Sequence, residues 1–171
     1  PIFVLGDSHA MNMYNITSKS NKFPFVIGLS KGGCRPHTIS DDCYYDDILN
    51  FLSDNSYLKP ILIYHQSGSY FIKDKYNNYE PSLKKEIFYD MENVKKVNIY
   101  LNKLSSLGVD VIWLGPFTEY RINPLLNPTW TEKVNPINFT VFDNIEDRIL
   151  NTIDNSNEYL YISFDEFYEV T

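Results

Sequence analysis

The sequence has little positive charge and few of the residues that bind metals. Only 15 Lys and Arg stand against 22 Asp and Glu, which gives a net charge of −7 and a pI near 4.9. Nucleic acids and anionic membrane surfaces both need a basic footprint, so this balance argues against either as a partner. With 3 His, and with 2 Cys that have no second pair at ligand spacing, we expect no metal site.

Long hydrophobic runs are also missing. No apolar stretch reaches the ~18–20 residues that a membrane-spanning helix needs, and no basic-then-apolar leader opens the chain. The 171 residues suit one domain and are too few for two ordinary ones. Pro1 lies directly on a strand-like segment without an initiator Met, so we expect a single domain, 1–171, cut at both ends from a longer chain.

The sequence does have an alternation of short apolar runs with amphipathic runs, which is typical of a layered α/β fold. Strand–helix–strand units linked in this way predict a three-layer α/β/α sandwich around a parallel five-stranded sheet, flavodoxin-like in plan. The expected strands span 2–5, 23–29, 61–64, 109–114 and 159–164. The expected helices span 8–19, 41–55 with Asp41 and Asp42 as caps, 82–107 ending at Gly108, and 139–155, with an exposed excursion at 73–79 and an irregular segment at 115–136.

Polar residues follow the ends of four of these expected strands. In an open parallel sheet, ligands bind outside the carboxyl ends of the strands. The first strand ends in Gly6-Asp7-Ser8-His9-Ala10, and the next three lead into residues 31–36, 65–70 and 115–119. Because these segments meet at one edge of the sheet, they predict a binding or catalytic site there.

Ser8 is the candidate nucleophile of this site. Gly6 allows a sharp turn, and Ser8 would lie at the start of the first helix, where unpaired backbone N–H groups can stabilise a developing oxyanion. An acyl-transfer nucleophile needs this geometry. The alternative is that Asp7 or Ser8 only caps the helix.

The segment Val4-Leu5-Gly6-Asp7-Ser8-His9-Ala10 resembles the first sequence block of the SGNH (GDSL-like) hydrolases. It is most similar to the SGNH domain fused to the C-terminus of membrane-bound, acyltransferase-3-type O-acyltransferases. That subgroup carries Cys-x-Pro after the second strand and Gly-Pro after the fourth, matched by Cys34-Arg35-Pro36 and Gly115-Pro116. Its W-x-x-Y motif is matched in part, with Ser67 in the Trp place and Tyr70 in the Tyr place.

The resemblance implies a role for each of the candidate catalytic residues. Ser8 would be the nucleophile, Asp7 would fix its turn by hydrogen bonds to backbone, and the N–H groups of Ser8 and Gly33 would form the oxyanion hole. The family's third donor is normally an Asn after the third strand. This sequence has His65-Gln66-Ser67 there instead, and we keep His65 and Gln66 as candidate catalytic residues.

The family's general base, a His in an Asp-x-x-His motif after the fifth strand, has no counterpart in this sequence. The chain ends just past Asp165, and no His follows His65. A positioned base typically contributes ~10²–10⁴-fold to the rate. Three explanations stay open: the motif lies beyond this sequence, the domain is complete but degenerate, or another His substitutes. For the last, His65 is better placed than His9 or His37, because it stands at the carboxyl end of a strand.

Cys34 and Cys43 have eight residues between them in a loop-like stretch. They could be two unrelated thiols. The resemblance implies instead the local disulfide often seen in the periplasmic subgroup, and such a bond requires an oxidising compartment.

Three residues are candidates for contact with substrate. Tyr70 and Phe117 fall in segments that would rim the site, and sugars stack well on aromatic faces. Arg35 could contact an acidic sugar. The alternatives are ordinary loop packing for the two aromatic rings, and solvation or pairing with a carboxylate for Arg35.

These features predict a serine-dependent O-acyl transferase or esterase, with acetyl the expected acyl group. The resemblance to the membrane-fused subgroup implies that it acts on a bacterial cell-surface polysaccharide, such as lipopolysaccharide, at the periplasmic face of the inner membrane. The expected partners are a saccharide acceptor, an acyl donor and an N-terminal membrane acyltransferase domain in the same chain, with no nucleic acid and no bound cofactor.

Two other functions suit the size and acidity of the chain. One is a catalytically inactive SGNH-like domain that only binds glycan. The other is a flavodoxin-like carrier, but the first loop lacks a Ser/Thr-rich phosphate cradle and Asp7 would repel a phosphate.

Overall fold

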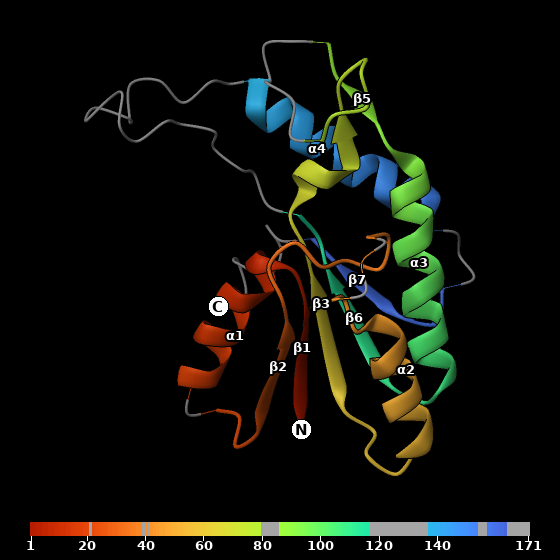
Figure 1. The fold of residues 1–171 in the computed structure, drawn as a ribbon. Coiled ribbons are helices and arrows are strands. Elements are labelled where there is room, and N and C mark those ends of the chain that lie inside the picture. Colours follow the sequence, from red (N-terminus) through yellow and green to blue (C-terminus); the bar gives the residue numbers. More distant parts are fainter. Residues whose placement is uncertain are drawn as a thin grey trace.

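The computed structural model describes residues 1–20, 22–38, 40, 42–79, 86–116, 137–153 and 157–163. Its centre is a five-stranded sheet in the order β2-β1-β3-β6-β7, in which all neighbouring strands are parallel (Figure 1). The strands are β1 (Ile2–Gly6), β2 (Val26–Ser30), β3 (Ile61–His65), β6 (Asp110–Leu114) and β7 (Leu160–Ile162). The sheet confirms the predicted fold class.

Helices cover both faces of this sheet, which makes the three layers. Helix α1 (Ser8–Lys19) lies on one face, and α2 (Tyr45–Asp54) and α3 (Met91–Ser106) lie on the other (Figure 1). Helix α4 (Ile137–Thr152) packs with α3 in that second layer. Along β1, Phe3 and Leu5 point into the large core on the side of α2 and α3, whereas Ile2 and Val4 point toward α1. This alternation fixes which side of β1 meets which helices.

Gly6 closes β1 at a point where no other residue fits. Its φ is +145°, and a Cβ there would lie 1.8 Å from the carbonyl oxygen of His65 and 2.9 Å from the Cβ of Ala10. The backbone of β1 therefore passes in direct contact with the end of β3 and turns at once into α1. This turn places Asp7 and Ser8 at the carboxyl edge of the sheet.

The third helix begins later than its sequence pattern predicts. It starts at Met91 rather than at residue 82, because β5 (Phe88–Tyr89) pairs antiparallel with β4 (Ile72–Lys73), and residues 80–85 lie outside the described part of the chain. Asp90 is the cap, since its side chain accepts a hydrogen bond from the backbone N–H of Asn93 at 3.3 Å. Phe88 and Tyr89 thus belong to a strand pair and not to the helix.

The start of the second helix also differs from the prediction. Helix α2 begins at Tyr45, and no side chain caps it, so Asp42 is not the cap; Asp41 lies outside the described residues. The carbonyl of Asp42 instead accepts a hydrogen bond from Lys31 Nζ at 3.0 Å. The neighbouring Cys43 is bonded to Cys34, which holds this segment on the loop after β2.

The remaining boundaries shift by a few residues. Strand β2 starts at residue 26 rather than 23, and α4 and β7 each end two or three residues early. Residues 75–79 are exposed, as expected, and form a turn around the side chain of Asp74.

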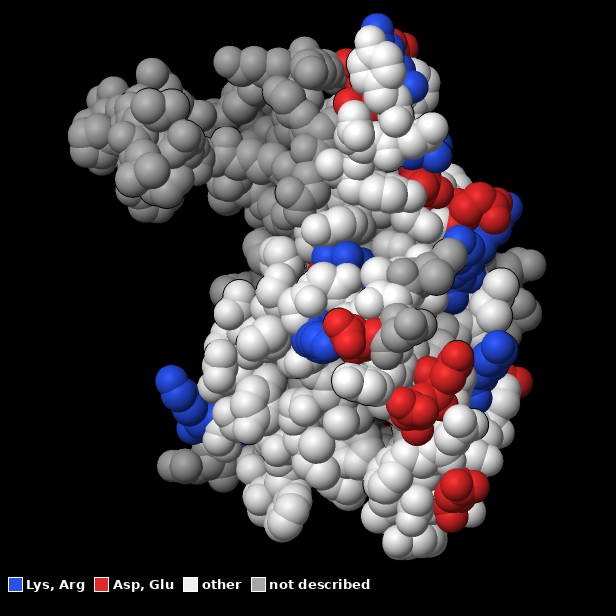
Figure 2. Space-filling model, viewed as in Figure 1, with Lys and Arg blue, Asp and Glu red and all other residues white. Residues whose placement is uncertain are grey.

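The surface of the described residues carries both signs of charge. On the face seen in Figure 2, acidic and basic groups alternate, and the described residues form no continuous basic patch there. No described helix is long and apolar enough to cross a membrane. Within the described ranges, no cluster of three or more His, Cys, Asp or Glu could hold a metal ion.

We expect Gly6→Ala to destabilise the domain by at least about 4 kcal/mol, because its Cβ would collide with backbone that cannot move without parting β1 from β3. Gly108→Ala is the matched control, since Gly108 also has a positive φ, +81°, but open space around it. That control should lose only about 1–2 kcal/mol from backbone strain. Urea unfolding of both variants measures the difference, and equal losses would contradict the close-contact explanation.

Candidate active site

Ser8 is the first residue of α1 and is exposed, whereas Asp7 before it is fully buried. The Asp7 carboxylate accepts a hydrogen bond from the backbone N–H of His9 at 2.9 Å and so caps the helix. Capping and a candidate nucleophile therefore occur together in this turn. The N-terminus of a 12-residue helix presents unpaired N–H groups and a positive dipole end beside the Ser8 hydroxyl.

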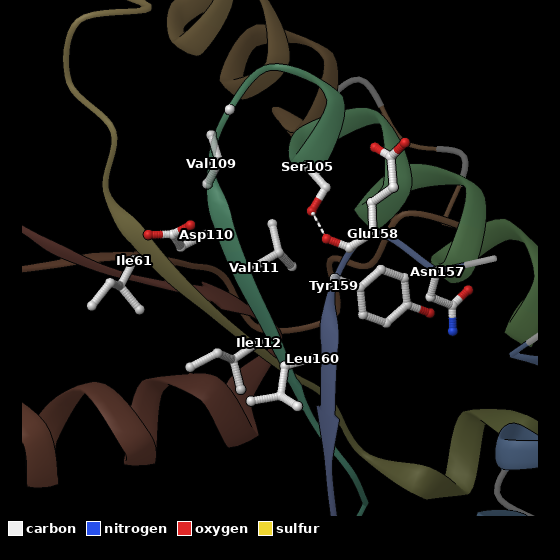
Figure 3. Close-up of a pocket in the computed structure, with 11 residues that line it drawn as sticks. Ile61, Ser105, Val109, Asp110, Val111, Ile112, Asn157, Glu158, Tyr159 and Leu160 are labelled. Atoms are coloured by element: carbon white, nitrogen blue, oxygen red, sulfur yellow. Dashed lines mark hydrogen bonds between the residues drawn. The ribbon is translucent and has the colours of Figure 1, made fainter. Parts of the chain in front are cut away.

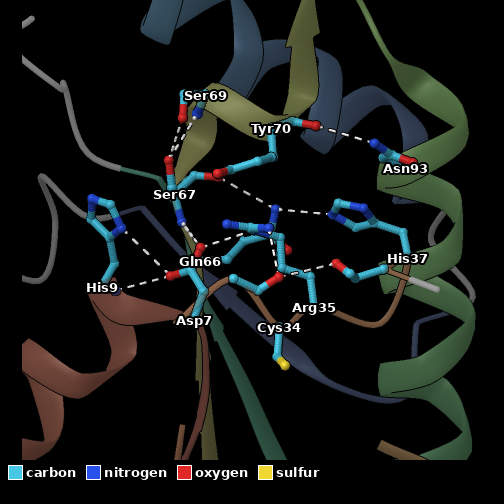
Figure 4. A network of polar contacts seen from close by, with 12 residues as sticks. Asp7, His9, Cys34, Arg35, His37, Gln66, Ser67, Ser69, Tyr70 and Asn93 are labelled. Carbon is cyan, nitrogen blue, oxygen red and sulfur yellow. Dashed lines mark hydrogen bonds and ion pairs between the residues drawn. The ribbon is translucent and has the colours of Figure 1, made fainter. Parts of the chain in front are cut away.

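The carboxylate of Asp7 also joins the loops that follow β2 and β3 (Figure 4). Its Oδ2 accepts a hydrogen bond from Arg35 Nε at 3.0 Å and one from the backbone N–H of Ser67 at 3.1 Å. Burial alone would raise the pKa of Asp7, but the hydrogen bonds from His9, the charge of Arg35 and the bond from Ser67 together hold the pKa below its usual value. Asp7 is thus a charged, buried acceptor that orients three segments of the site.

Gly33 lies in a tight turn that is bonded to the Gly6–Asp7 segment. The backbone N–H of Cys34 donates to the carbonyl of Lys31 at 3.1 Å, and the N–H of Lys31 donates to the carbonyl of Gly6, also at 3.1 Å. Gly33 is exposed, with a φ of +82° and open space where a Cβ would stand. An acyl group bound at this edge of the sheet would therefore meet no side chain at Gly33.

The disulfide between Cys34 and Cys43 is present, which confirms the predicted pairing. Its S–S distance is 2.10 Å and its Cα atoms lie 5.3 Å apart. Tyr45 Oη donates to the carbonyl of Cys34 at 3.2 Å, and Tyr100 Oη on α3 donates to the carbonyl of Tyr45 at 2.9 Å. The turn that carries Gly33 is thus anchored to both α2 and α3.

The side chain of Gln66 bonds inside the protein. It is 1% exposed. Its Oε1 accepts a hydrogen bond from Tyr64 Oη, and its Nε2 lies 3.5 Å from Nε2 of His37. This placement does not favour Gln66 as the third donor of an oxyanion hole.

His65 is also an interior residue, with a side chain only 1% exposed. Its Nδ1 lies 3.0 Å from the carbonyl oxygen of Leu114, so Nδ1 carries the proton. Burial lowers the pKa of His65 to about 4. A general base works best with a pKa near the working pH, so the environment of His65 does not favour it as a substitute base.

The other two histidines differ in their surroundings. Burial, with the nearby charge of Arg35, lowers the pKa of His37 to about 4. His9 is partly exposed, and its Nδ1 lies 3.5 Å from Asp7 Oδ1. The ring of His9 also lies edge-on to that of His65, with centroids 6.2 Å apart. Of the three, His9 alone combines partial exposure with a carboxylate partner.

The structure describes two of the three residues that were predicted to contact substrate, Arg35 and Tyr70. Arg35 is 5% exposed and paired with Asp7, which favours the alternative that it binds a carboxylate of the protein. The ring of Tyr70 stacks on its guanidinium, with Cζ 3.1 Å from the ring centroid, and Tyr70 is half-buried. Phe117 lies outside the described residues.

Two residues of this network were missed by sequence reasoning. Ser69 Oγ lies 2.5 Å from Ser67 Oγ in the short 3₁₀ helix that follows β3, and Asn93 on α3 donates from Nδ2 to the carbonyl of Tyr70 at 3.2 Å. The Ser-x-Ser spacing after a strand is a usable signal for the first, since Ser67 caps that helix by accepting from the Ser69 N–H at 3.2 Å. Asn93 carries no such local signal.

Two cavities differ in their relation to this network. One of about 340 Å³ lies between β2 and α2 and is lined in part by Gly6, Lys31 and Cys34, so it adjoins the turn that carries Gly33. Another of about 700 Å³ lies at the opposite end of the sheet, beside Val109, Tyr159 and Leu160 (Figure 3). Only the first lies at the edge where the candidate catalytic residues gather.

No family model matches the chain, and no curated protein matches it. Among solved structures, the crystal structure of TesA is similar to this chain, with 14% sequence identity and a TM-score of 0.39. The match covers 87% of this chain and 74% of the TesA chain. A likeness at this level does not carry a conclusion about activity.

We expect the free energy of unfolding to fall as the pH drops from about 6.5 to 4. His37 and His65 have pKa values of about 4 in the folded protein, whereas unfolded His titrates near 6.5, so the unfolded chain binds more protons in this range. Each ring adds up to about 1.4 kcal/mol per pH unit. Urea unfolding across this range measures how steeply the free energy of unfolding changes with pH. A His37→Gln/His65→Gln variant should lose the part of this pH dependence that the two histidines contribute. An unchanged pH dependence in the variant would show that the two histidines do not cause it.

Reduction of the disulfide should lower the free energy of unfolding by roughly 2.5–3 kcal/mol, the loop-entropy value for so short a loop. Chemical denaturation with and without reductant measures the loss. A Cys34→Ala/Cys43→Ala variant is the control, because its stability should not respond to reductant. A loss of similar size in that variant would assign the effect to something other than the bond.

Proposed function

We propose that this chain is a serine-dependent acyl hydrolase or O-acyltransferase whose nucleophile is Ser8. The observation that carries the proposal is the exposed hydroxyl at the first residue of α1, directly after a buried, charged Asp7 that is bonded to the loops following β2 and β3. If Asp7 only capped α1, its carboxylate would not need bonds to Arg35 and Ser67 as well as to His9. An activated nucleophile does need a rigid turn, because catalysis depends on its orientation.

The reaction would proceed through an ester of Ser8. The Ser8 oxygen forms a bond to the carbonyl carbon of the acyl donor, and its proton passes to a general base, which the family resemblance places after the fifth strand. Negative charge then develops on the carbonyl oxygen, where N–H groups at the α1 terminus and at Gly33 can stabilise it. The donor's oxygen leaves with a proton, and water or a sugar hydroxyl takes the acyl group in the second step.

The finer assignment concerns the substrate. We propose acetyl transfer to a bacterial surface polysaccharide, at the extracytoplasmic face of the inner membrane, with an N-terminal membrane domain supplying the acyl group. Two features support it: the motif resemblance of residues 4–10, and the Cys34–Cys43 disulfide, which is compatible with an oxidising compartment.

Ser8→Ala should abolish labelling of the chain by a fluorophosphonate, which forms a bond from phosphorus to Ser8 Oγ as fluoride leaves. It should also abolish hydrolysis of p-nitrophenyl acetate. Because Ser8 is exposed, the variant should keep its unfolding free energy within about 0.5 kcal/mol.

Ser18→Ala is the matched control, since Ser18 is an exposed serine on the same helix and should leave labelling unchanged. Mass spectrometry of the labelled peptide locates the adduct. Full labelling of Ser8→Ala would show that Ser8 is not the nucleophile.

The second candidate function is a catalytically inactive domain that binds glycan. The interior placement of Gln66 and the low pKa of His65, about 4, favour it, because neither suits a catalytic role. Wild-type protein that binds an oligosaccharide in calorimetry but takes up no fluorophosphonate at Ser8 would support this function over the first.

A further inference from the structure

The guanidinium of Arg35 lies between Asp7, in the turn after β1, and Tyr70, in the segment after β3 (Figure 4). Arg35 comes from the loop after β2 and is 5% exposed. Its Nε donates to Asp7 Oδ2 at 3.0 Å, its Nη1 donates to the carbonyl of Gly33 at 3.0 Å, and its Cζ lies 3.1 Å from the ring centroid of Tyr70. One planar group thus contacts Asp7 in the turn before Ser8, Gly33 in the candidate oxyanion hole, and Tyr70 in the segment after β3.

Such a buried charge is costly unless it is paired and hydrogen-bonded. The arrangement satisfies both conditions, because the carboxylate of Asp7 is itself buried and negative. The geometry is specific to arginine: a rigid fork donates in two directions in its plane while its flat face stacks on an aromatic ring. A lysine ammonium has no flat face and cannot make all three contacts.

Gly33 has no side chain to hold its own position. It lies exposed at a positive φ. Besides the Lys31–Cys34 turn, the bond from Arg35 Nη1 to its carbonyl is what ties this residue to Asp7. A donor stabilises a developing oxyanion only when its direction is set before the reaction.

We propose that Arg35 is a positioning residue of the Ser8 site, which fixes the Gly33 backbone relative to the nucleophile turn and neutralises Asp7 beneath it. The inference rests on the proposed function. Arg35 touches no reacting atom, so its effect is on the transition state rather than on ground-state binding. Loss of the guanidinium leaves the Gly33 carbonyl with the longer bond from Thr38 Oγ1, at 3.4 Å. It also removes the positive charge beside the Asp7 carboxylate, one residue from Ser8, and both changes oppose negative charge on the acyl oxygen.

The test measures the second-order rate constant for fluorophosphonate labelling of Ser8, together with kcat and KM for p-nitrophenyl acetate. Arg35→Ala should lower the labelling rate and kcat by roughly 10²-fold, comparable to the loss of one oxyanion-hole donor, with KM within about twofold. Arg35→Lys should remain at least about tenfold below wild type, because the ammonium keeps the charge but not the fork.

Free guanidinium provides a readout that a purely structural role would not move. Added at tens of millimolar, below denaturing concentrations, it should restore at least about tenfold of the lost rate in Arg35→Ala, whereas ethylammonium at the same ionic strength should not. Arg148→Ala is the matched control, since Arg148 also stacks on a tyrosine, 4.2 Å from the ring of Tyr89, and should leave every rate unchanged.

The outcomes separate the two proposals. Wild-type protein with no Ser8-dependent labelling would overturn the proposed function and this inference with it. Wild-type protein that labels, while a folded Arg35→Ala variant labels at the same rate, would overturn the inference alone. Should Arg35→Ala not fold, the folded Arg35→Lys variant decides: an unchanged rate overturns the inference, and a loss of tenfold or more supports it.

Discussion

The burial of one carboxylate governs the carboxyl edge of this sheet. Asp7 is fully enclosed and charged, and a buried charge must find partners. It finds them 28 and 60 residues away along the chain, in the side chain of Arg35 and the backbone N–H of Ser67. Because these bonds cross from one loop to the next, the segments that follow β1, β2 and β3 form a single connected unit.

The strands of the central sheet could be predicted from the sequence because each is a short apolar run between polar segments, and strand–helix alternation leaves few topologies. The observed order β2-β1-β3-β6-β7 is the one expected of a flavodoxin-like sheet. The start of α3 could not be predicted in this way. Nothing in the sequence around Phe88 and Tyr89 marks them as a strand, and only their pairing with Ile72 and Lys73 makes them one.

At the site, features that depend on neighbouring residues could be predicted from the sequence. The orientation of side chains that depend on distant partners could not. The exposed hydroxyl at the start of α1 depends on three adjacent residues, Gly6, Asp7 and Ser8. The disulfide could be predicted from the motif resemblance. The orientations of Arg35 and Gln66 depend on partners far along the chain, Asp7 for one and Tyr64 with His37 for the other. Sequence patterns around each residue hold no information about such partners, so the sequence leaves Arg35 open between contact with an acidic sugar and pairing with a carboxylate, and it offers Gln66 only as a candidate for catalysis.

The disulfide has a consequence for the order of assembly. Both cysteines belong to the first 43 residues, so the bond needs neither β3 nor any later strand to be in place. A loop of about ten residues closes by diffusion in roughly 10–100 ns, whereas β1 must find β3 across 59 positions, as the pairing of Ile2 with Ile61 requires. Oxidation of the two thiols takes seconds to hours, depending on the oxidant that accepts their two electrons. It can close the ring containing Arg35 on a chain whose β3 has not yet paired, and β3 then brings the amide of Ser67 to the same edge of the sheet.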